Sequence, residues 1–123
     1  MQQISESEYI LMKIIWENRG AALYSHIITQ LEKDKNPWKK NTVLTLLSRL
    51  VEKGYLKTNK IGRRNEYEAL ITEQEYQTLQ TNSFLHRIFG GNAHSLVSTL
   101  LQEDMISAEE LREIEKYWEE QNE

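Results

Sequence analysis

Ten basic side chains gather between Lys33 and Arg64, and only Asp34 and Glu52 oppose them. Guanidinium and ammonium groups bind phosphate, while short hydroxyl and amide side chains bind base edges, so this segment has the chemistry of nucleic-acid recognition. The alternative is an ordinary solvated surface. The candidate contact residues are Lys40, Asn41, Thr42, Leu44, Thr45, Arg49, Lys60, Arg63 and Arg64.

The first six of these residues belong to a predicted helix that runs from about Lys39 to Lys53. Apolar residues at steps of three and one predict that one helix face is buried. The residues expected in the core are Val43, Leu46, Leu47, Leu50 and Val51. The opposite face would carry Asn41, Thr45 and Ser48, with Thr42, Leu44 and Arg49 on its flanks.

A short β-hairpin is predicted directly after this helix. Gly54 can end the helix in the left-handed conformation, residues 55–60 have the pattern of a strand, residues 62–65 that of a turn, and residues 66–70 that of a return strand. Lys57, Lys60, Arg63 and Arg64 would lie on or near this hairpin and contact phosphates. The order of helix, strand, basic turn and strand is the layout of a winged helix-turn-helix, which places one helix in the DNA major groove.

Two further helices are predicted before this segment. Ser5 and Glu8 have capping-box spacing, and the apolar stripe after them ends near Gly20. A second helix is expected from about Ser25 to Lys33. Residues 21–23 between them are short enough for a small strand or an extended connection.

The charge changes sign along the chain. Residues 1–71 hold 12 Lys and Arg against 8 Asp and Glu, whereas residues 72–123 hold 3 against 11. The net charge of -4 and the pI of about 5.5 would by themselves argue against nucleic acid. A basic part followed by an acidic part indicates two modules with different partners. We therefore expect a winged-helix DNA-binding domain over 1–71 and a helical dimerisation domain over 72–123.

Three short amphipathic helices are predicted in the second module. Thr72 with Glu75 and Ser107 with Glu110 have capping spacing, and Gly90-Gly91 would end the first of the three. About fifty residues make a poor independent core, so their apolar faces should be covered by a second copy of the chain or by the N-terminal module. The residues expected at a dimer interface are Phe84, Ile88, Leu96, Val97, Leu100, Leu101, Leu111, Ile114 and Trp118.

Several classes of function are not favoured by the composition. The chain has no cysteine, and its three histidines lack metal-ligand spacing, so we expect no metal, no cofactor and no enzymatic activity. No signal peptide and no apolar run of membrane-spanning length is visible, which predicts a cytoplasmic protein without a membrane partner. The competing hypothesis is a winged helix that binds other proteins and no DNA.

With these residues placed, the chain resembles the penicillinase-repressor (BlaI/MecI) family over nearly its whole length. The resemblance begins with the Ser5 to Glu8 opening and Ile14-Ile15-Trp16, and continues with Asn41-Thr42-Val43 and Leu50 to Leu56. Its more specific part is Phe84-Leu85, Phe89-Gly90-Gly91, Ser95-Leu96-Val97 and the stretch from Glu109 to Ile114.

The resemblance implies a homodimeric transcriptional repressor that binds inverted-repeat double-stranded operators. Thr42, Thr45 and Arg49 match family positions that face DNA, whereas the position of Asn41 is often basic in the family and that of Leu44 is often arginine. The resemblance also implies a regulatory protease partner, which in β-lactam-responsive members cuts an Asn-Phe bond in the dimerisation helices. The matching positions here are Thr99 and Leu100. Copper-responsive relatives use a cysteine cluster that this chain lacks.

Overall fold

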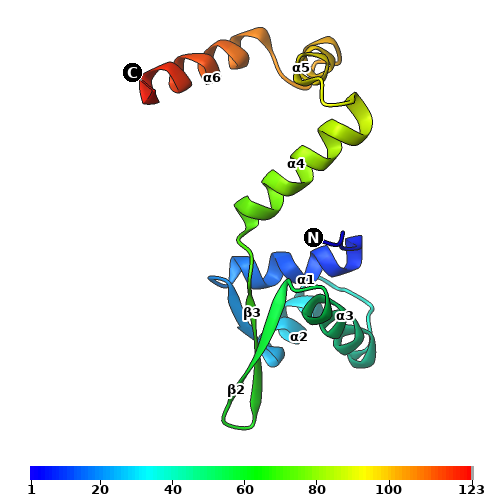
Figure 1. Cartoon of the computed structure of the whole chain (residues 1–123). Coiled ribbons are helices and arrows are strands. Elements are labelled where there is room, and N and C mark those ends of the chain that lie inside the picture. The colour runs from blue at the N-terminus through cyan, green and yellow to red at the C-terminus, as the bar shows by residue number, and fades with distance from the viewer. Residues whose placement is uncertain (123) are drawn as a thin grey trace. The chain divides into compact units, whose positions relative to one another are not determined.

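The computed structural model describes residues 1–122 as helices and short strands that form two compact units (Figure 1). The first unit is Met1–Gln77, and the second begins at Thr78. The elements are α1 (Glu6–Glu17), β1 (Ala21–Leu23), α2 (Tyr24–Lys33), α3 (Lys40–Glu52), β2 (Leu56–Ile61), β3 (Arg64–Ala69), α4 (Glu73–Phe89), α5 (Ala93–Gln102) and α6 (Ala108–Gln121). The predicted fold class, mostly α with a small β wing, is confirmed.

The three strands form one antiparallel sheet in the order β1-β3-β2. Residues 21–23 are therefore a strand, in which Ala22 pairs with Tyr67. The hairpin turn is tighter than the predicted 62–65 turn, because Ile61 pairs with Arg64 and only Gly62 and Arg63 lie between the strands. Gly62 has φ +63°, the sign expected at the first loop position of a type II′ turn, so the chain reverses in two residues and Arg64 and Asn65 join β3.

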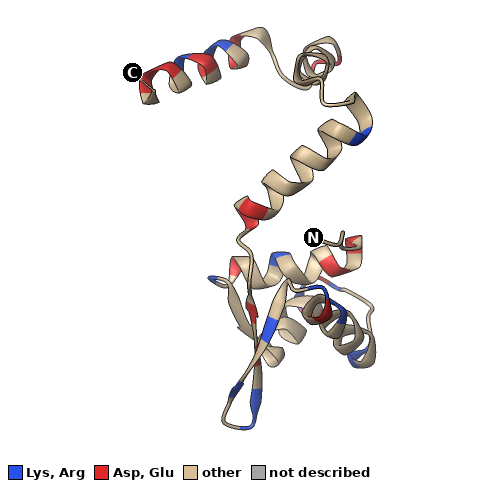
Figure 2. Ribbon diagram, in the orientation of Figure 1, with Lys and Arg blue, Asp and Glu red and all other residues tan. Residues whose placement is uncertain are grey.

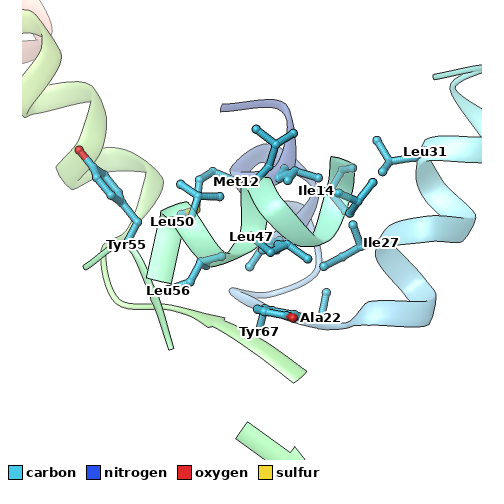
Figure 3. Packing of buried hydrophobic residues seen from close by; sticks show 14 of the residues in the cluster. Met12, Ile14, Ala22, Ile27, Leu31, Leu47, Leu50, Tyr55, Leu56 and Tyr67 are labelled. Atoms are coloured by element: carbon cyan, nitrogen blue, oxygen red, sulfur yellow. The ribbon is translucent and has the colours of Figure 1, made fainter. Parts of the chain in front are cut away.

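The core of the first unit lies between α1, α2, α3 and the sheet (Figure 3). Leu11, Ile15, Ile27, Val43 and Leu47 are fully buried. These residues come from three helices whose apolar spacing the sequence displays, and each helix contributes one stripe to a shared interior. The predicted buried face of α3 is confirmed for Val43, Leu46, Leu47 and Leu50.

The prediction for Val51 is wrong, because its side chain is 37% exposed. The helix ends beside it in a Schellman arrangement, in which the Tyr55 N–H donates to the Leu50 carbonyl at 2.9 Å and the Gly54 N–H to the Val51 carbonyl at 3.1 Å. Gly54 permits this turn with φ +84°. The chain thus returns immediately, and Tyr55 and Leu56, each 1% exposed, fill the core next to Leu50.

The first turn of α4 packs within the first unit. Tyr76 stacks on Tyr9 with ring centroids 5.7 Å apart and also lies 5.5 Å from Trp16 and 6.1 Å from Tyr55. Trp16 Nε1 donates to the Ile71 carbonyl at 2.9 Å, which ties α1 to the segment before α4. The compact unit therefore extends to Gln77, beyond the winged helix proper.

The second unit contains the rest of α4 together with α5 and α6. The predicted capping box of α6 is confirmed, since the Glu110 N–H donates to Ser107 Oγ at 3.0 Å and the Ser107 N–H to Glu110 Oε1 at 3.1 Å. Gly90 and Gly91 follow α4 as predicted. Over Thr78–Asn122 no side chain is buried. The helices of this unit have defined ends, but they do not enclose a hydrophobic core.

Candidate nucleic-acid interface

The third helix presents a polar and basic face to solvent. Its first turn begins with exposed Lys40, and its outward face carries Asn41, Thr42, Leu44, Thr45 and Arg49, all exposed. Thr45 Oγ1 donates to the Asn41 carbonyl at 2.9 Å, so this hydroxyl oxygen can still accept a hydrogen bond. The face therefore offers hydrogen-bond donors and acceptors, the guanidinium group of Arg49 and the apolar side chain of Leu44, which is 40% exposed.

A partly buried ion pair holds the C-terminal end of α3 against α1. Lys53 Nζ lies 2.8 Å from Glu8 Oε1 and also donates to the Gln3 carbonyl at 3.1 Å. Burial acts to raise the pKa of the Glu8 carboxyl, but hydrogen bonds from Lys53 and Ser5 outweigh it and hold that pKa below its ordinary value. The second carboxylate oxygen of Glu8 is buried without a hydrogen-bond partner within residues 1–122. The sequence pattern identifies Glu8 as a helix cap but gives no sign of its ion pair with Lys53.

The hairpin carries paired charges along its length and unpaired ones at its closed end. Asn59 Nδ2 donates to Glu66 Oε1 at 3.2 Å and to Glu68 Oε1 at 2.8 Å, and Lys57 Nζ lies 3.7 Å from Glu68 Oε1. Lys60, Arg63 and Arg64 are exposed at the closed end, where Figure 2 shows basic residues on both strands. Their side chains have no hydrogen-bond or ion-pair partner in the described part of the chain.

The closed end of the hairpin lies beside the start of α2. Arg63, Arg64 and Asn65 line a depression of about 400 Å³ together with Leu23, Tyr24 and Ser25. The local sequence pattern does not single out Tyr24 or Ser25. Their proximity to the hairpin depends on the pairing of β1 with β3, which joins Leu23 to Glu66 across 43 residues of chain.

The residues expected at a dimer interface are all incompletely buried in the single chain. Phe84, Ile88, Val97, Ile114 and Trp118 are exposed, with Ile88 at 58% and Trp118 at 67%. Leu96, Leu100, Leu101 and Leu111 are half-buried. Phe84 and Phe89 make an edge-to-face ring contact at 5.9 Å. The apolar residues therefore remain available for burial by a partner.

The two positions matched to a protease site lie inside α5. Thr99 and Leu100 are half-buried, and Thr99 Oγ1 donates to the Ser95 carbonyl at 2.9 Å. The Leu100 carbonyl accepts from the Met105 N–H at 2.8 Å just beyond the helix end. The peptide bond between Thr99 and Leu100 therefore lies within an α-helix.

A three-helix unit with an outward polar third helix and a basic hairpin is the architecture of a winged-helix DNA-binding protein. The family model described as penicillinase repressor matches residues 4–120. The chain belongs to this family, which consists of transcriptional repressors and not of enzymes.

Relatives and solved structures agree with this assignment. The chain is 36% identical over 118 residues to the penicillinase repressor of Bacillus licheniformis, covering 96% of this chain and 91% of the relative. It is 28% identical over 112 residues to the methicillin resistance regulatory protein MecI of Staphylococcus aureus strain N315, covering 91% and 89%.

Two solution structures resemble the first unit. The DNA-binding domain of the repressor BlaI matches with a TM-score of 0.53 at 36% identity, covering 60% of this chain and 88% of that one. The Bacillus licheniformis BlaI monomeric form in complex with the blaP half-operator matches with a TM-score of 0.52 at 36% identity, covering 61% and 89%. Within residues 1–122, none of the helices combines the length and apolar character needed to cross a bilayer.

Proposed function

We propose that this protein represses transcription by binding, as a homodimer, to an inverted-repeat DNA operator. The observation that carries the proposal is the exposed face of α3 beside a hairpin whose closed end holds three basic side chains with no ion-pair partner among residues 1–122. The BlaI structure in complex with the blaP half-operator supports the same use of the fold here.

In this proposal α3 enters the major groove. Arg49 contacts a guanine edge or a phosphate, and the methyl groups of Thr42 and Thr45 with Leu44 contact thymine methyls. Asn41 presents an amide to a base edge, and Lys40 at the start of the helix contacts the backbone. Because every one of these side chains is exposed, none needs to leave the core to reach DNA.

The hairpin and the C-terminal helices have separate roles. Lys60, Arg63 and Arg64 contact phosphates and thereby fix the position of the protein without reading sequence. The segment 72–123 joins two copies through its exposed apolar side chains, and two-fold symmetry matches an inverted repeat. The winged helix over 1–71 is then the DNA-binding part of each subunit.

We also propose where a regulatory protease would act. The Thr99 to Leu100 bond lies in α5, between two half-buried side chains. A protease needs an extended substrate, so α5 must open locally before this bond can be cut. Cleavage there would separate Leu96 and Val97 from Leu100, Leu101 and α6, and so weaken the dimer. The mass of the fragments after exposure to a candidate protease tests the position.

Fluorescence anisotropy with a labelled duplex from the protein's own upstream region, beside a scrambled duplex, tests DNA recognition. We expect preference for the upstream duplex, and a loss of more than about 1 kcal/mol for Arg49→Ala on that duplex if the residue contacts a base. Arg87→Ala, which removes an exposed arginine outside the proposed DNA-binding part, is the matched control. Equal, weak binding of both duplexes would favour a protein-binding winged helix instead.

A further inference from the structure

A group of four aromatic rings holds the first turn of α4 to the winged unit. The Tyr76 ring stacks on that of Tyr9 at 5.7 Å and lies 5.5 Å from that of Trp16. The ring of Tyr55 meets it edge-to-face at 6.1 Å. Tyr76 is 9% exposed and Tyr55 1%. We call these four residues the aromatic cluster.

Polar contacts from α1 support the same turn. Trp16 Nε1 donates to the Ile71 carbonyl at 2.9 Å, two residues before α4 begins. Lys13 Nζ lies 2.8 Å from Oε2 of Glu73, the first residue of α4. Because both partners of this ion pair are partly exposed, it contributes little by itself. The buried rings therefore supply most of the attachment.

One ring of the aromatic cluster is fixed directly to the end of α3. The Tyr55 N–H donates to the Leu50 carbonyl in the last turn of α3 at 2.9 Å, and its carbonyl accepts from the Leu70 N–H at 2.8 Å. Its hydroxyl donates to the Gln2 carbonyl at 2.6 Å. Tyr55 therefore has little freedom to move, and the helix proposed to read DNA and the first turn of α4 are held by the same rings.

Beyond this turn, the winged unit no longer encloses the chain. No side chain of residues 77–122 is buried, and the second compact unit begins at Thr78. The helix itself continues without a break, because the 17 residues of α4 include neither glycine nor proline. Sharp kinks in helices are nearly always found at such residues or at local insertions. The direction of the first turn is thus passed on along α4.

We propose that the aromatic cluster fixes the direction in which α4 leaves the winged unit, and thereby sets the separation of half-sites that the dimer accepts. This inference rests on the proposed function, since it needs a dimer and an inverted repeat. Tyr76 is then a positioning residue that determines specificity through α4 and not by touching DNA.

The physical reason is that two linked contacts strengthen binding only when both can be made at once. One inserted base pair moves a half-site by about 3.4 Å along the duplex and turns it by about 35°. A dimer whose winged units are firmly attached to α4 cannot follow this displacement. A dimer with a loosened attachment can follow it, because each winged unit turns about the root of α4.

Duplexes that differ only in half-site separation test the role of Tyr76. Anisotropy is measured on the upstream inverted repeat, on the same repeat with one inserted base pair, and on a single half-site. The insertion should weaken the unmodified protein by about tenfold or more, and Tyr76→Leu by less than about threefold. Tyr76→Leu should keep its affinity for the single half-site, and sedimentation should show it still dimeric.

Two further tyrosine variants separate positioning from general destabilisation. Tyr67→Leu removes a ring that is 7% exposed, in β3 and outside the aromatic cluster, and should keep the full loss on insertion. Tyr76→Phe retains the stacked ring and should keep it too. If Tyr67→Leu tolerates the insertion as well as Tyr76→Leu does, weakened folding explains both variants and the proposal is overturned.

A pair of variants at Thr78 tests the same idea without changing the aromatic cluster. Thr78 is exposed and lies two residues beyond Tyr76 in α4. Thr78→Gly loosens the helix there, whereas Thr78→Ala favours it. The inserted base pair should therefore cost Thr78→Gly less affinity than Thr78→Ala. This pair decides the question if Tyr76→Leu loses half-site binding, and equal costs for the two variants would overturn the proposal.

Failure of this inference can be told apart from failure of the proposed function. If the unmodified protein does not prefer the upstream duplex to a scrambled one, or binds the inverted repeat no more tightly than one half-site, the proposed dimeric repressor fails and this inference with it. If both preferences hold but the insertion costs the unmodified protein nothing, or costs Tyr76→Leu just as much, only the role of the aromatic cluster is overturned.

Discussion

The winged unit and the C-terminal unit use similar helices but reach different degrees of burial. In the first unit sixteen apolar side chains are buried, with Leu11, Ile27 and Leu47 fully enclosed. In the second, no side chain of Thr78–Asn122 is buried, although α6 has a capping box like that of α1 and Asn92 caps α5. Caps and amphipathic spacing are therefore enough to begin and end a helix but not to enclose a core.

The difference follows from what each helix can face. In the winged unit, α1, α2 and α3 converge on a sheet that brings β1 next to β3, so every apolar stripe meets others (Figure 3). In α6, Tyr117 and Trp118 are 65% and 67% exposed. Exposed aromatic residues of this size on a short helix are typical of a surface that another chain covers.

The largest effect expected from this contrast is on the core of the winged unit. Leu47→Ala removes a fully buried side chain and should lower the free energy of unfolding by about 2–5 kcal/mol. Hydrogen exchange of the α3 amides measures this loss. Ile88→Ala, at a residue 58% exposed in the second unit, should leave the same amides nearly unchanged. Equal losses would mean that the two units unfold together.

The next effect concerns the proposed dimer. Leu100→Asp places a charge among half-buried apolar side chains of α5 and should shift sedimentation towards the monomer. Binding to an inverted-repeat duplex should then weaken by about 100-fold, because two linked contacts become one, while binding to a single half-site is retained. Gln102→Asp, at an exposed position of α5, is the control. An intact dimer in Leu100→Asp would remove this interface from the proposal.

A smaller effect is expected at the one buried carboxylate of the winged unit. Glu8→Gln removes the charge that faces Lys53 at 2.8 Å and should cost about 1–3 kcal/mol at pH 7. Because the pKa of Glu8 is lowered in the folded state, its contribution is present above the ordinary value of 4.5 and is lost as pH falls through the native pKa.

Urea unfolding at several pH values measures this dependence. The unmodified protein should lose the Glu8 contribution on acidification below pH 4.5, and Glu8→Gln should show a correspondingly flatter profile. Glu6→Gln, in the same helical turn but exposed, should keep the profile of the unmodified protein. Identical profiles for all three proteins would show that the Lys53 pair does not contribute to stability.

The smallest effect is expected where the helical pattern predicted burial and the structure shows exposure. Val51→Ser should change the free energy of unfolding by less than about 0.5 kcal/mol, because the side chain is 37% exposed. Leu50→Ser, one residue earlier and fully buried, is the contrasting variant and should destabilise strongly. Chemical denaturation of both variants measures the difference, and a large loss for Val51→Ser would place that residue in the core after all.

Much of the winged unit could be predicted because its signals are local. The Ser5 and Glu8 capping box, the stripe through Val43 and Leu50, and the Gly54 helix stop each act within a few residues. The exposed face of α3 follows from the same periodicity. Arg64 and Asn65 were placed in a turn because the sequence does not show that Gly62 and Arg63 alone complete the reversal.

The helices, the basic hairpin, the acidic C-terminal part and the family can be predicted from the order of the residues, because caps, periodicity and charge are properties of neighbouring residues. Other contacts become visible in the folded unit alone. Lys53 meets Glu8, Tyr76 packs among three other aromatic rings, and Tyr24 and Ser25 lie beside Arg63 and Arg64. These contacts join residues about 20 or more positions apart, or depend on the register of β1 against β3. Such pairings are fixed by packing of the whole unit, and local spacing carries no record of them.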